Sequence, residues 1–355
     1  MKKTSMPQLK DIATEAHVSM ATASIILRDG KGRFAEKTRR RVLDAAQKLG
    51  WRQNLLVHSI QTGKTKAIGL LIPPFDSYWA SVLTGIHQIL MEADYMPITL
   101  WVGDGERFAD DGQGLEQIHK LVDRRVEGLL AWPDFATAYE EYFKDLVGRG
   151  IPLVVVDHDL EKYRVADSVQ TDEELGGRLA AEHLLNLGHT DIGCITEFEK
   201  EARSWQMRRQ RYFEFALRTL APQVRYRSWH MAEGDRDGVR IAKEVLQLRD
   251  RPTAIFADTD HVANDVYNAA ADLGLTIPDD ISVVGFSGLD FTKRMRPPLT
   301  TVKQNSIEVG KCAGRIIIQR IEKELTGPVS TIRVGCELIV RESTAKPRPN
   351  SLANG

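Results

Sequence analysis

The sequence of 355 residues lacks the features that mark membrane, secreted or disulfide-stabilised proteins. No apolar run approaches the roughly eighteen residues that a membrane-spanning helix needs, and Lys2 and Lys3 are not followed by the apolar segment of a signal peptide. We therefore expect a cytoplasmic protein with no membrane partner. The three cysteines lie far apart in apolar runs, so neither a disulfide framework nor a zinc site is expected at Cys194, Cys312 and Cys336.

The sequence motifs of common enzyme classes are also missing. Residues 103–105 lack the third glycine of a dinucleotide-binding fingerprint, no Walker sequence occurs, and the glycine spacing at 285–288 is not that of a nucleophile elbow. Asp157, His158 and Asp159 could form a metal pair. Adjacent residues of an extended run point to opposite sides, however, which favours hydrogen bonding in a cleft. We expect no catalysis, no metal and no cofactor.

Charge is divided unevenly along the chain. Residues 1–66 hold 14 Lys and Arg against 5 Asp and Glu, a net charge of +9, whereas residues 67–355 hold 34 against 44, a net charge of −10. Because neutralised phosphates supply most of the non-specific affinity for DNA, a basic head on an acidic body is typical of a nucleic-acid-binding module. A membrane-surface head is the alternative, but the large apolar face of an interfacial helix is absent.

The segment from Leu9 to Arg28 predicts two short helices joined by a tight turn. The first half carries an apolar face made by Ile12, Ala13 and Ala16. Ser19 then stands where a helix N-cap is needed, ahead of a second helix that begins at Met20 and is rich in small residues. This is the pattern of a helix-turn-helix, whose second helix lies in the major groove, although an ordinary helical hairpin would share it.

The head continues with a third amphipathic helix, expected from Glu36 to Leu49 and closed by Gly50 as a left-handed C-cap. A short apolar stretch follows from Leu55 to Gln61. Seven residues make a helix that is marginal alone in water, so this stretch should fold only against a partner.

From Lys66 onward, short apolar runs alternate with longer amphipathic stretches. The runs are Ala67–Ile72, Pro97–Trp101, Gly128–Trp132, Leu153–Val156, Ile192–Ile195, Thr253–Ala257 and Ser282–Gly285. Continuous apolar strands between helices indicate parallel sheets covered on both faces, and the length suggests two of them. The predicted class is therefore α/β, with a ligand site beyond the carboxyl ends of the strands.

These segments together resemble the LacI/GalR family of transcriptional repressors, in the order DIATEAHVSMATAS, TRRRVLDAAQKLGWRQN, SIQTGKT, AIGLLIP, RRVEGLLAW, EHLLNLGH, PTAIFADTD and IPDDISVVGFSG. The resemblance runs from about Leu9 to Thr344. It implies an all-α helix-turn-helix head, a hinge helix and a two-lobed, periplasmic-binding-protein-like α/β domain of type I. The implied bounds are 1–50 for the head, 51–66 for the hinge, 67–344 for the two lobes and 345–355 for a disordered tail.

Within the two-lobed domain, the resemblance implies three crossovers near Val165, Pro297 and Gly327. Lobe one is accordingly expected over residues 67–165 and 298–327, and lobe two over residues 166–297 and 328–344. The tail is polar and broken by proline, so it cannot form the apolar heptads of a tetramerising coil, and a homodimer is expected.

The resemblance also implies which residues contact DNA. Base contacts are expected from the second helix at Met20, Ala21 and Ile25, where Ile25 replaces the family's usual Arg, so thymine methyls and DNA shape would supply specificity. The remaining contacts of the head are expected at Ser19, Thr22, Ser24 and Arg28, mostly to phosphates. The hinge is expected to contribute Asn54, His58 and Ile60, with Ile60 as an apolar wedge in the minor groove.

An effector site is implied at the strand ends that face the cleft between the lobes. The family pattern carries over onto Phe75, Tyr78, Trp79, Asp157, His158, Asp159, Arg203, Arg209, Thr259 and Asp260. Ser287 and Gly288 stand where the family has Asp-Asp, and Asp290 is a candidate substitute. Stacking on a sugar is expected from Trp79, Trp132 and Trp205, with ordinary packing inside a lobe as the alternative.

We therefore expect a repressor of carbohydrate metabolism genes that binds palindromic operator DNA and is switched by a sugar or sugar derivative. A regulator that responds to a nucleoside or another metabolite, or that needs a corepressor, remains open. A solute-binding protein is disfavoured by the basic head and the missing signal peptide, and an enzyme by the missing catalytic motifs.

Overall fold

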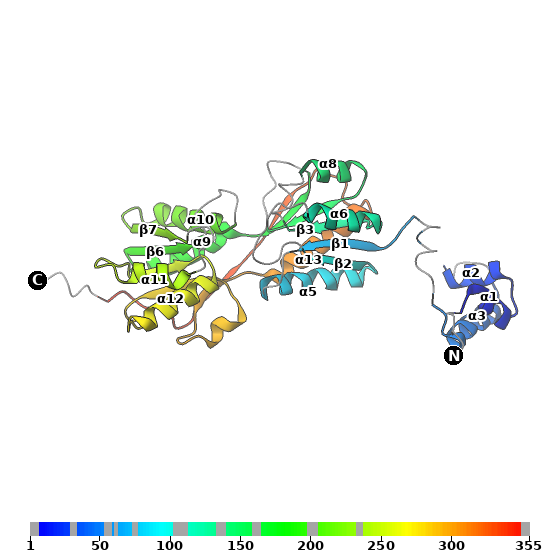
Figure 1. Ribbon diagram of the computed structural model, residues 1–355, viewed down its shortest axis with the longest axis horizontal. Helices are drawn as coiled ribbons and strands as arrows, with labels where there is room; N and C mark the ends of the chain where they lie inside the picture. The colour runs from blue at the N-terminus through cyan, green and yellow to red at the C-terminus, as the bar shows by residue number, and fades with distance from the viewer. Residues whose placement is uncertain are drawn as a thin grey trace, which may run out of the picture. The chain divides into compact units, whose positions relative to one another are not determined.

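The computed structural model describes residues 7–28, 34–52, 59, 63–72, 77–101, 113–132, 140–157, 165–196, 205–231 and 237–348. The chain divides into two units, Met1–Thr65 and Lys66–Gly355. Figure 1 shows that the first unit is a helical head and the second an α/β body. Across these described ranges, no helix combines the length and the apolar character that crossing a membrane requires.

The head contains the three predicted helices, which are α1 (Leu9–Glu15), α2 (Met20–Arg28) and α3 (Glu36–Leu49). The predicted N-cap is confirmed, because the backbone N–H of Thr22 donates to Ser19 Oγ at 3.1 Å. Gly50 ends α3 in the left-handed region, at φ 65°. The core of the head is formed by Ile12, Ala13, Ala16, Ala23, Ile26, Val42, Ala45 and Ala46. Except for Ser59, the predicted hinge helix lies outside the described residues.

Lobe one of the body is built on a six-stranded parallel sheet, in the order β11-β5-β4-β3-β1-β2. Its strands are β1 (Ala67–Ile72), β2 (Met96–Trp101), β3 (Gly128–Ala131), β4 (Leu153–Val156), β5 (Asp167–Thr171) and β11 (Thr331–Val334). Its described helices are α5 (Ser77–Glu92), α6 (Gln113–Asp123), α8 (Glu140–Gly148) and α13 (Ser306–Ile321). Gly69 lies under α6 and Gly128 under α13, so helices cover both faces of the sheet.

Lobe two repeats this plan with the sheet order β12-β10-β9-β8-β6-β7, in which β12 alone is antiparallel. Its strands are β6 (Asp191–Thr196), β7 (Arg225–His230), β8 (Ala254–Ala257), β9 (Ser282–Ser287), β10 (Thr300–Lys303) and β12 (Glu337–Ile339). Its described helices are α9 (Glu173–Asn186), α10 (Trp205–Leu220), α11 (Gly238–Leu246), α12 (Asp260–Asp272) and the short 3-10 helix η1 (Asp290–Arg294).

Successive side chains along the strands of lobe two lie on opposite faces of the sheet. Cys194 and Phe256 pack toward α9 and α10, whereas their neighbours Ile195 and Ile255 pack toward α11 and α12. Every residue of β8 is buried, as the continuous apolar run predicts for a central parallel strand. The α/β prediction is therefore confirmed in both lobes.

The chain crosses between the lobes at Asp172, at residues 304–305 and at residues 335–336. Each crossover lies several residues beyond the predicted positions near Val165, Pro297 and Gly327. The predicted lobe bounds 67–165, 298–327, 166–297 and 328–344 are therefore wrong: β5 and β11 belong to lobe one and β10 to lobe two.

The polar character of β5 explains why the first crossover is easy to misplace. The strand reads Asp-Ser-Val-Gln-Thr, yet all five residues are buried. Arg320 on α13 donates to both carboxylate oxygens of Asp167, at 2.7 and 3.0 Å. A bidentate pair with a residue far along the chain thus replaces the apolar contacts that a buried strand ordinarily shows.

Helices α5 and α13 pack together through glycine. A Cβ atom at Gly310 would lie 2.0 Å from the carbonyl oxygen of Val82, and one at Gly85 would lie 2.0 Å from that of Ile307. Because both obstacles are backbone atoms, no side chain can turn away to make room.

The end of the described chain lies against lobe two. Ala345 accepts a hydrogen bond from Nε2 of His189 at 2.9 Å and donates its backbone N–H to Ser282 Oγ at 3.0 Å. Arg348 pairs with Asp279 at 2.9 Å. The prediction of a disordered tail over 345–355 is therefore wrong for residues 345–348, because the backbone of Ala345 and the side chain of Arg348 have partners in the lobe. Residues 349–355 lie outside the described part.

We predict that Gly310→Ala lowers the free energy of unfolding of the body by about 3 kcal/mol, since the added methyl forces the two helix backbones apart. Gly148→Ala is the matched control, because nothing lies within 4 Å of a Cβ atom at that position. Urea unfolding followed by circular dichroism measures both values. Equal stability of the two variants would contradict the close approach of α5 and α13.

We predict a second effect from His189, whose pKa is lowered to about 4 because burial disfavours the charged ring. The unfolded state binds the proton near pH 6.5, so stability is lost as the pH falls from about 6.5 toward 4. Between pH 7 and pH 5 the loss should be about 2 kcal/mol. Urea unfolding at both pH values should show this loss in the wild type and a smaller loss in His189→Gln; equal losses would contradict the assignment.

Candidate functional site

Five of the predicted effector residues lie around the strand ends and crossovers of the two lobes. Tyr78 begins α5, Asp157 follows β4, Arg209 lies in α10, and Thr259 and Asp260 follow β8. The predictions for Phe75, His158, Asp159, Arg203 and the side chain of Trp205 lie outside the described residues.

Asp157 and Tyr78 are brought together at the lobe-one side of this region. The hydroxyl of Tyr78 donates to the Asp157 carboxylate, and the backbone N–H of Thr171 donates to Asp157 Oδ1 at 3.2 Å. Burial raises the pKa of Asp157, which these two donors partly offset, and burial also raises the pKa of Tyr78. Gln304, on the second crossover, donates to Thr171 Oγ1 at 2.8 Å. This network therefore includes one of the crossovers between the lobes.

Arg209 is held by residues of its own lobe. Its Nε donates to Glu173 Oε2 at 2.8 Å, its Nη1 donates to the carbonyl oxygen of Asp258 at 2.9 Å, and its guanidinium lies 4.0 Å from the ring centroid of Phe286. The side chains of Arg209 and Glu173 are only 4% and 5% exposed. Burial raises the pKa of Glu173, and the adjacent Arg209 opposes this shift. The predicted arginine is thus part of a buried ion pair.

Arg208 connects the two lobes. From α10 in lobe two, its Nη1 donates to Gln170 Oε1 at 2.7 Å and its Nη2 donates to the carbonyl oxygen of Asp157 at 3.3 Å, both in lobe one. A contact of this kind strengthens or breaks when the lobes move. Arg208 therefore links α10 of lobe two to Gln170 and Asp157 of lobe one.

Sequence reasoning missed Arg208 and Glu173. An acidic residue in the first turn of a helix ordinarily interacts with the helix dipole, so Glu173 gave no sign of a distant partner. The one available signal was the Arg-Arg pair beside the predicted Arg209, but successive helix positions point in different directions.

Thr259 and Asp260 stabilise two different elements, α12 and the loop after β9. Thr259 caps α12, and the buried carboxylate of Asp260 accepts from the backbone N–H of Leu289 at 2.7 Å and from Thr301 Oγ1 at 2.6 Å. Asp290 does not join this group, because its side chain is 92% exposed and pairs with Lys293 at 2.9 Å. No three His, Cys, Asp or Glu side chains of the described chain are grouped as metal ligands.

The described tryptophans of the predicted site are packed inside lobe one. Trp79 and Trp132 are buried in its core and contact each other edge to face, with ring centroids 6.0 Å apart. Their geometry corresponds to ordinary packing, which was the alternative to stacking on a ligand.

The head presents an apolar strip at the start of α2. The side chains of Met20 and Ile25 are 57% and 37% exposed, and Ala21 is exposed beside them. Ala23 and Ile26 of the same helix are buried against α1 and α3. The predicted contacts of the Arg28 side chain and of Asn54, His58 and Ile60 lie outside the described residues.

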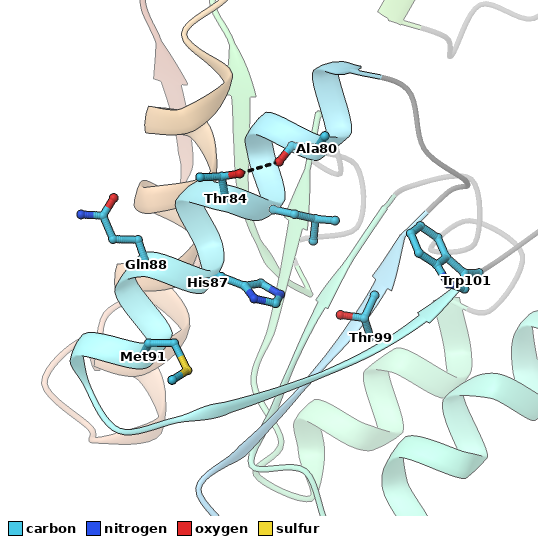
Figure 2. A pocket seen from close by; sticks show the side chains of 8 residues that line it. Ala80, Thr84, His87, Gln88, Met91, Thr99 and Trp101 are labelled. Carbon is cyan, nitrogen blue, oxygen red and sulfur yellow. Dashed lines mark hydrogen bonds between the residues drawn. The ribbon is translucent and has the colours of Figure 1, made fainter.

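A separate hollow of about 590 Å³ lies between α5 and the edge strand β2, away from the Asp157 network. Figure 2 shows His87 and Met91 of α5 and Thr99 and Trp101 of β2 around it. The hydroxyl of Thr84 is turned back to its own helix, where it donates to the carbonyl oxygen of Ala80 at 2.8 Å. The exposed surface here is consequently mostly apolar.

Comparison with known proteins places this geometry in a family. Residues 8–54 match the family model of bacterial regulatory proteins of the lacI family, and residues 181–344 match a periplasmic binding protein-like domain. The HTH-type transcriptional repressor PurR of Photobacterium profundum is 30% identical over 348 residues, which cover 95% of this chain and 98% of PurR.

Solved structures share the fold, and two of them serve as comparisons. The lac repressor dimer bound to operator and the anti-inducer ONPF has a TM-score of 0.81 at 22% identity, covering 96% of this chain and 100% of that one. A LacI family regulator from Enterococcus faecium with bound ribose has a TM-score of 0.65 at 26% identity, covering 79% of this chain and 100% of that one. With its helix-turn-helix head and two parallel-sheet lobes, the chain belongs to the LacI/GalR family of transcriptional repressors.

Proposed function

We propose that this repressor binds palindromic operator DNA as a homodimer and that a carbohydrate bound between its lobes switches its affinity for the operator. The observation that carries the effector proposal is the set of hydrogen-bonding groups at the crossovers, where Tyr78, Asp157 and Gln170 meet Arg208 of the other lobe. Few, well-positioned polar groups of this type suit a ligand rich in hydroxyls. The related Enterococcus faecium regulator with bound ribose supports the same ligand class.

The switch acts through a difference in ligand affinity between two arrangements of the lobes. Arg208 and Gln304 donate hydrogen bonds to lobe one at the crossovers, so lobe movement changes the surroundings of Asp157 and Thr171. The movement reaches the DNA through the short hinge segment between the head and the body. By linkage, a ligand that favours one arrangement changes operator affinity, and the operator changes ligand affinity by the same factor.

The DNA-binding part of the proposal rests on α2. Met20, Ala21 and Ile25 would meet thymine methyl groups in the major groove, while Ser19, Thr22, Ser24 and Arg28 position the head on the backbone. Asn54, His58 and Ile60 of the hinge would act in the minor groove.

The homodimer in this proposal uses the hollow between α5 and β2. β2 is an edge strand whose terminal residues Met96 and Trp101 are exposed, together with Met91 of α5. Exposed apolar groups that cluster at a sheet edge are typical of an interaction surface. The lac repressor structure is a dimer bound to operator, which supports the proposal of a dimer.

We predict that the full-length chain selects a palindromic duplex from a random library and that its affinity for this duplex falls about 10³- to 10⁵-fold between 50 and 200 mM salt. Ribose, cellobiose or another neutral sugar should shift the mobility-shift titration, and the same sugar should raise the unfolding temperature. Stabilisation should reach about 2.7 kcal/mol at a hundred times the dissociation constant.

Met20→Ala should weaken binding to the selected duplex about tenfold and leave random duplex unchanged, since only specific binding uses base contacts. Leu43→Ala is the matched control, because Leu43 is an exposed apolar residue on α3. A salt-independent affinity would contradict the operator proposal. A response to nucleosides and to no sugar would contradict the carbohydrate proposal alone.

We predict that Met91→Glu converts the dimer to monomers and weakens operator binding, because it places a carboxylate in the apolar surface between two copies. Phe215→Glu is the control, since the side chains of Phe215 and Met91 are both 64% exposed but Phe215 lies on α10 of lobe two. Sedimentation velocity distinguishes the two states. If Met91→Glu remains dimeric, the interface lies elsewhere.

A further inference from the structure

The charge of Arg209 is neutralised by the protein itself. The Nε–H of Arg209 donates to Glu173 at 2.8 Å and its Nη1–H donates to a backbone carbonyl at 2.9 Å, while one face of the guanidinium lies on Phe286. Both partners of the ion pair are almost completely buried. An incoming anion therefore meets a guanidinium that already has a carboxylate.

The second guanidinium of this region, that of Arg208, is engaged in part, because its Nε–H is buried without a hydrogen-bond partner among the described residues. Arg208 donates to the side-chain oxygen of Gln170 and to the carbonyl oxygen of Asp157, and both of these acceptors are uncharged. Four buried acidic residues interact with Arg209: Glu173 pairs with it, the carbonyl oxygen of Asp258 accepts from it, and the carboxylates of Asp157 and Asp260 lie within electrostatic range of it. In the described part of this region, buried carboxylates thus outnumber the two guanidinium groups.

A phosphate or carboxylate group on a ligand would be placed beside these carboxylates. Like charges brought together in a region with little water repel strongly, and the ligand group would also lose its hydration. It could gain the guanidinium of Arg209 only by displacing Glu173, which would then be a buried carboxylate without its partner.

We propose that Glu173 determines ligand specificity by excluding anions: it occupies Arg209, so the carbohydrate that acts on this repressor carries no phosphate or carboxylate group. This inference rests on the proposed function and narrows its ligand class to neutral sugars and aminosugars. Glu173 thereby has a role in ligand specificity, in addition to the interaction with the helix dipole that is usual for an acidic residue in the first turn of a helix.

The test compares wild type, Glu173→Gln and Glu174→Gln as full-length chains. Glutamine keeps an oxygen that accepts from Arg209 but removes the charge, so Glu173→Gln leaves a buried guanidinium in need of an anion. Glu174 is the matched control, because it is the next residue on α9, its side chain is 56% exposed, and it lies 3.7 Å from Arg333. The two variants therefore change the net charge equally.

Unfolding temperatures are measured with inorganic phosphate against sodium chloride at equal ionic strength, and with ribose against ribose 5-phosphate. We expect wild type and Glu174→Gln to show no phosphate-specific stabilisation. Glu173→Gln should show saturable stabilisation by phosphate, with an affinity at least tenfold above that of the control. It should bind ribose 5-phosphate at least tenfold more tightly than the wild type does.

Phosphate-specific stabilisation of the wild type, or equal behaviour of Glu173→Gln and Glu174→Gln, would overturn the proposal. If Glu173→Gln is unfolded in chloride, refolding in phosphate supports the proposal. Failure to refold in phosphate, while the double variant Glu173→Gln with Arg209→Gln does fold, overturns it. If the protein responds only to uncharged nucleosides, the proposal of a carbohydrate effector is contradicted, whereas the proposal that Glu173 excludes anions is not. Failure of one proposal can therefore be distinguished from failure of the other.

Discussion

The body of this repressor depends on the three passages of one chain between two separate sheets. Because the crossovers at Asp172, residues 304–305 and residues 335–336 all join the same two lobes, neither lobe can move without straining or shifting these segments. The hydrogen bonds made by Thr171, Gln304 and Arg208 are concentrated there. The effector site proposed at the crossovers would therefore couple ligand binding to lobe movement.

Buried charge is the second feature that organises the body. Asp167 is paired with Arg320 inside lobe one, and Glu173 with Arg209 at the start of lobe two, so the two pairs lie on either side of the first crossover. Burying an ion costs free energy unless a partner is positioned for it, which makes such pairs demanding of geometry. They hold β5 and α9 in one arrangement on each side of the point where the chain changes lobes.

The head is organised differently, by small apolar residues. Ala13, Ala16 and Ala23 allow α1 and α2 to approach closely, and this leaves Met20 and Ile25 on the outer side of α2. A helix that buries one face against its neighbours and exposes short apolar groups on the other is suited to lie in a groove. The head and the body are therefore stabilised by different kinds of packing, small apolar residues in the head and covered parallel sheets in the body.

Local sequence was sufficient for the elements whose stability is local or uniformly apolar. The Ser19 cap, the Gly50 end of α3 and the apolar strands β1 and β4 follow from neighbouring residues, because capping and hydrophobic periodicity act over a few positions. The family resemblance rested on these same segments. It also led to Tyr78 and Asp157, which the structure places in one hydrogen-bond network.

Only the tertiary structure decided what depends on partners distant in the chain. The polar strand β5 is buried because Arg320 reaches Asp167 across 153 positions, and Glu173 meets Arg209 across 36. Trp79 and Trp132 likewise contact each other edge to face in the core of lobe one. Periodicity and capping report the surroundings of a residue along its own element, whereas the pairing of buried charges and rings is set by how separate elements meet.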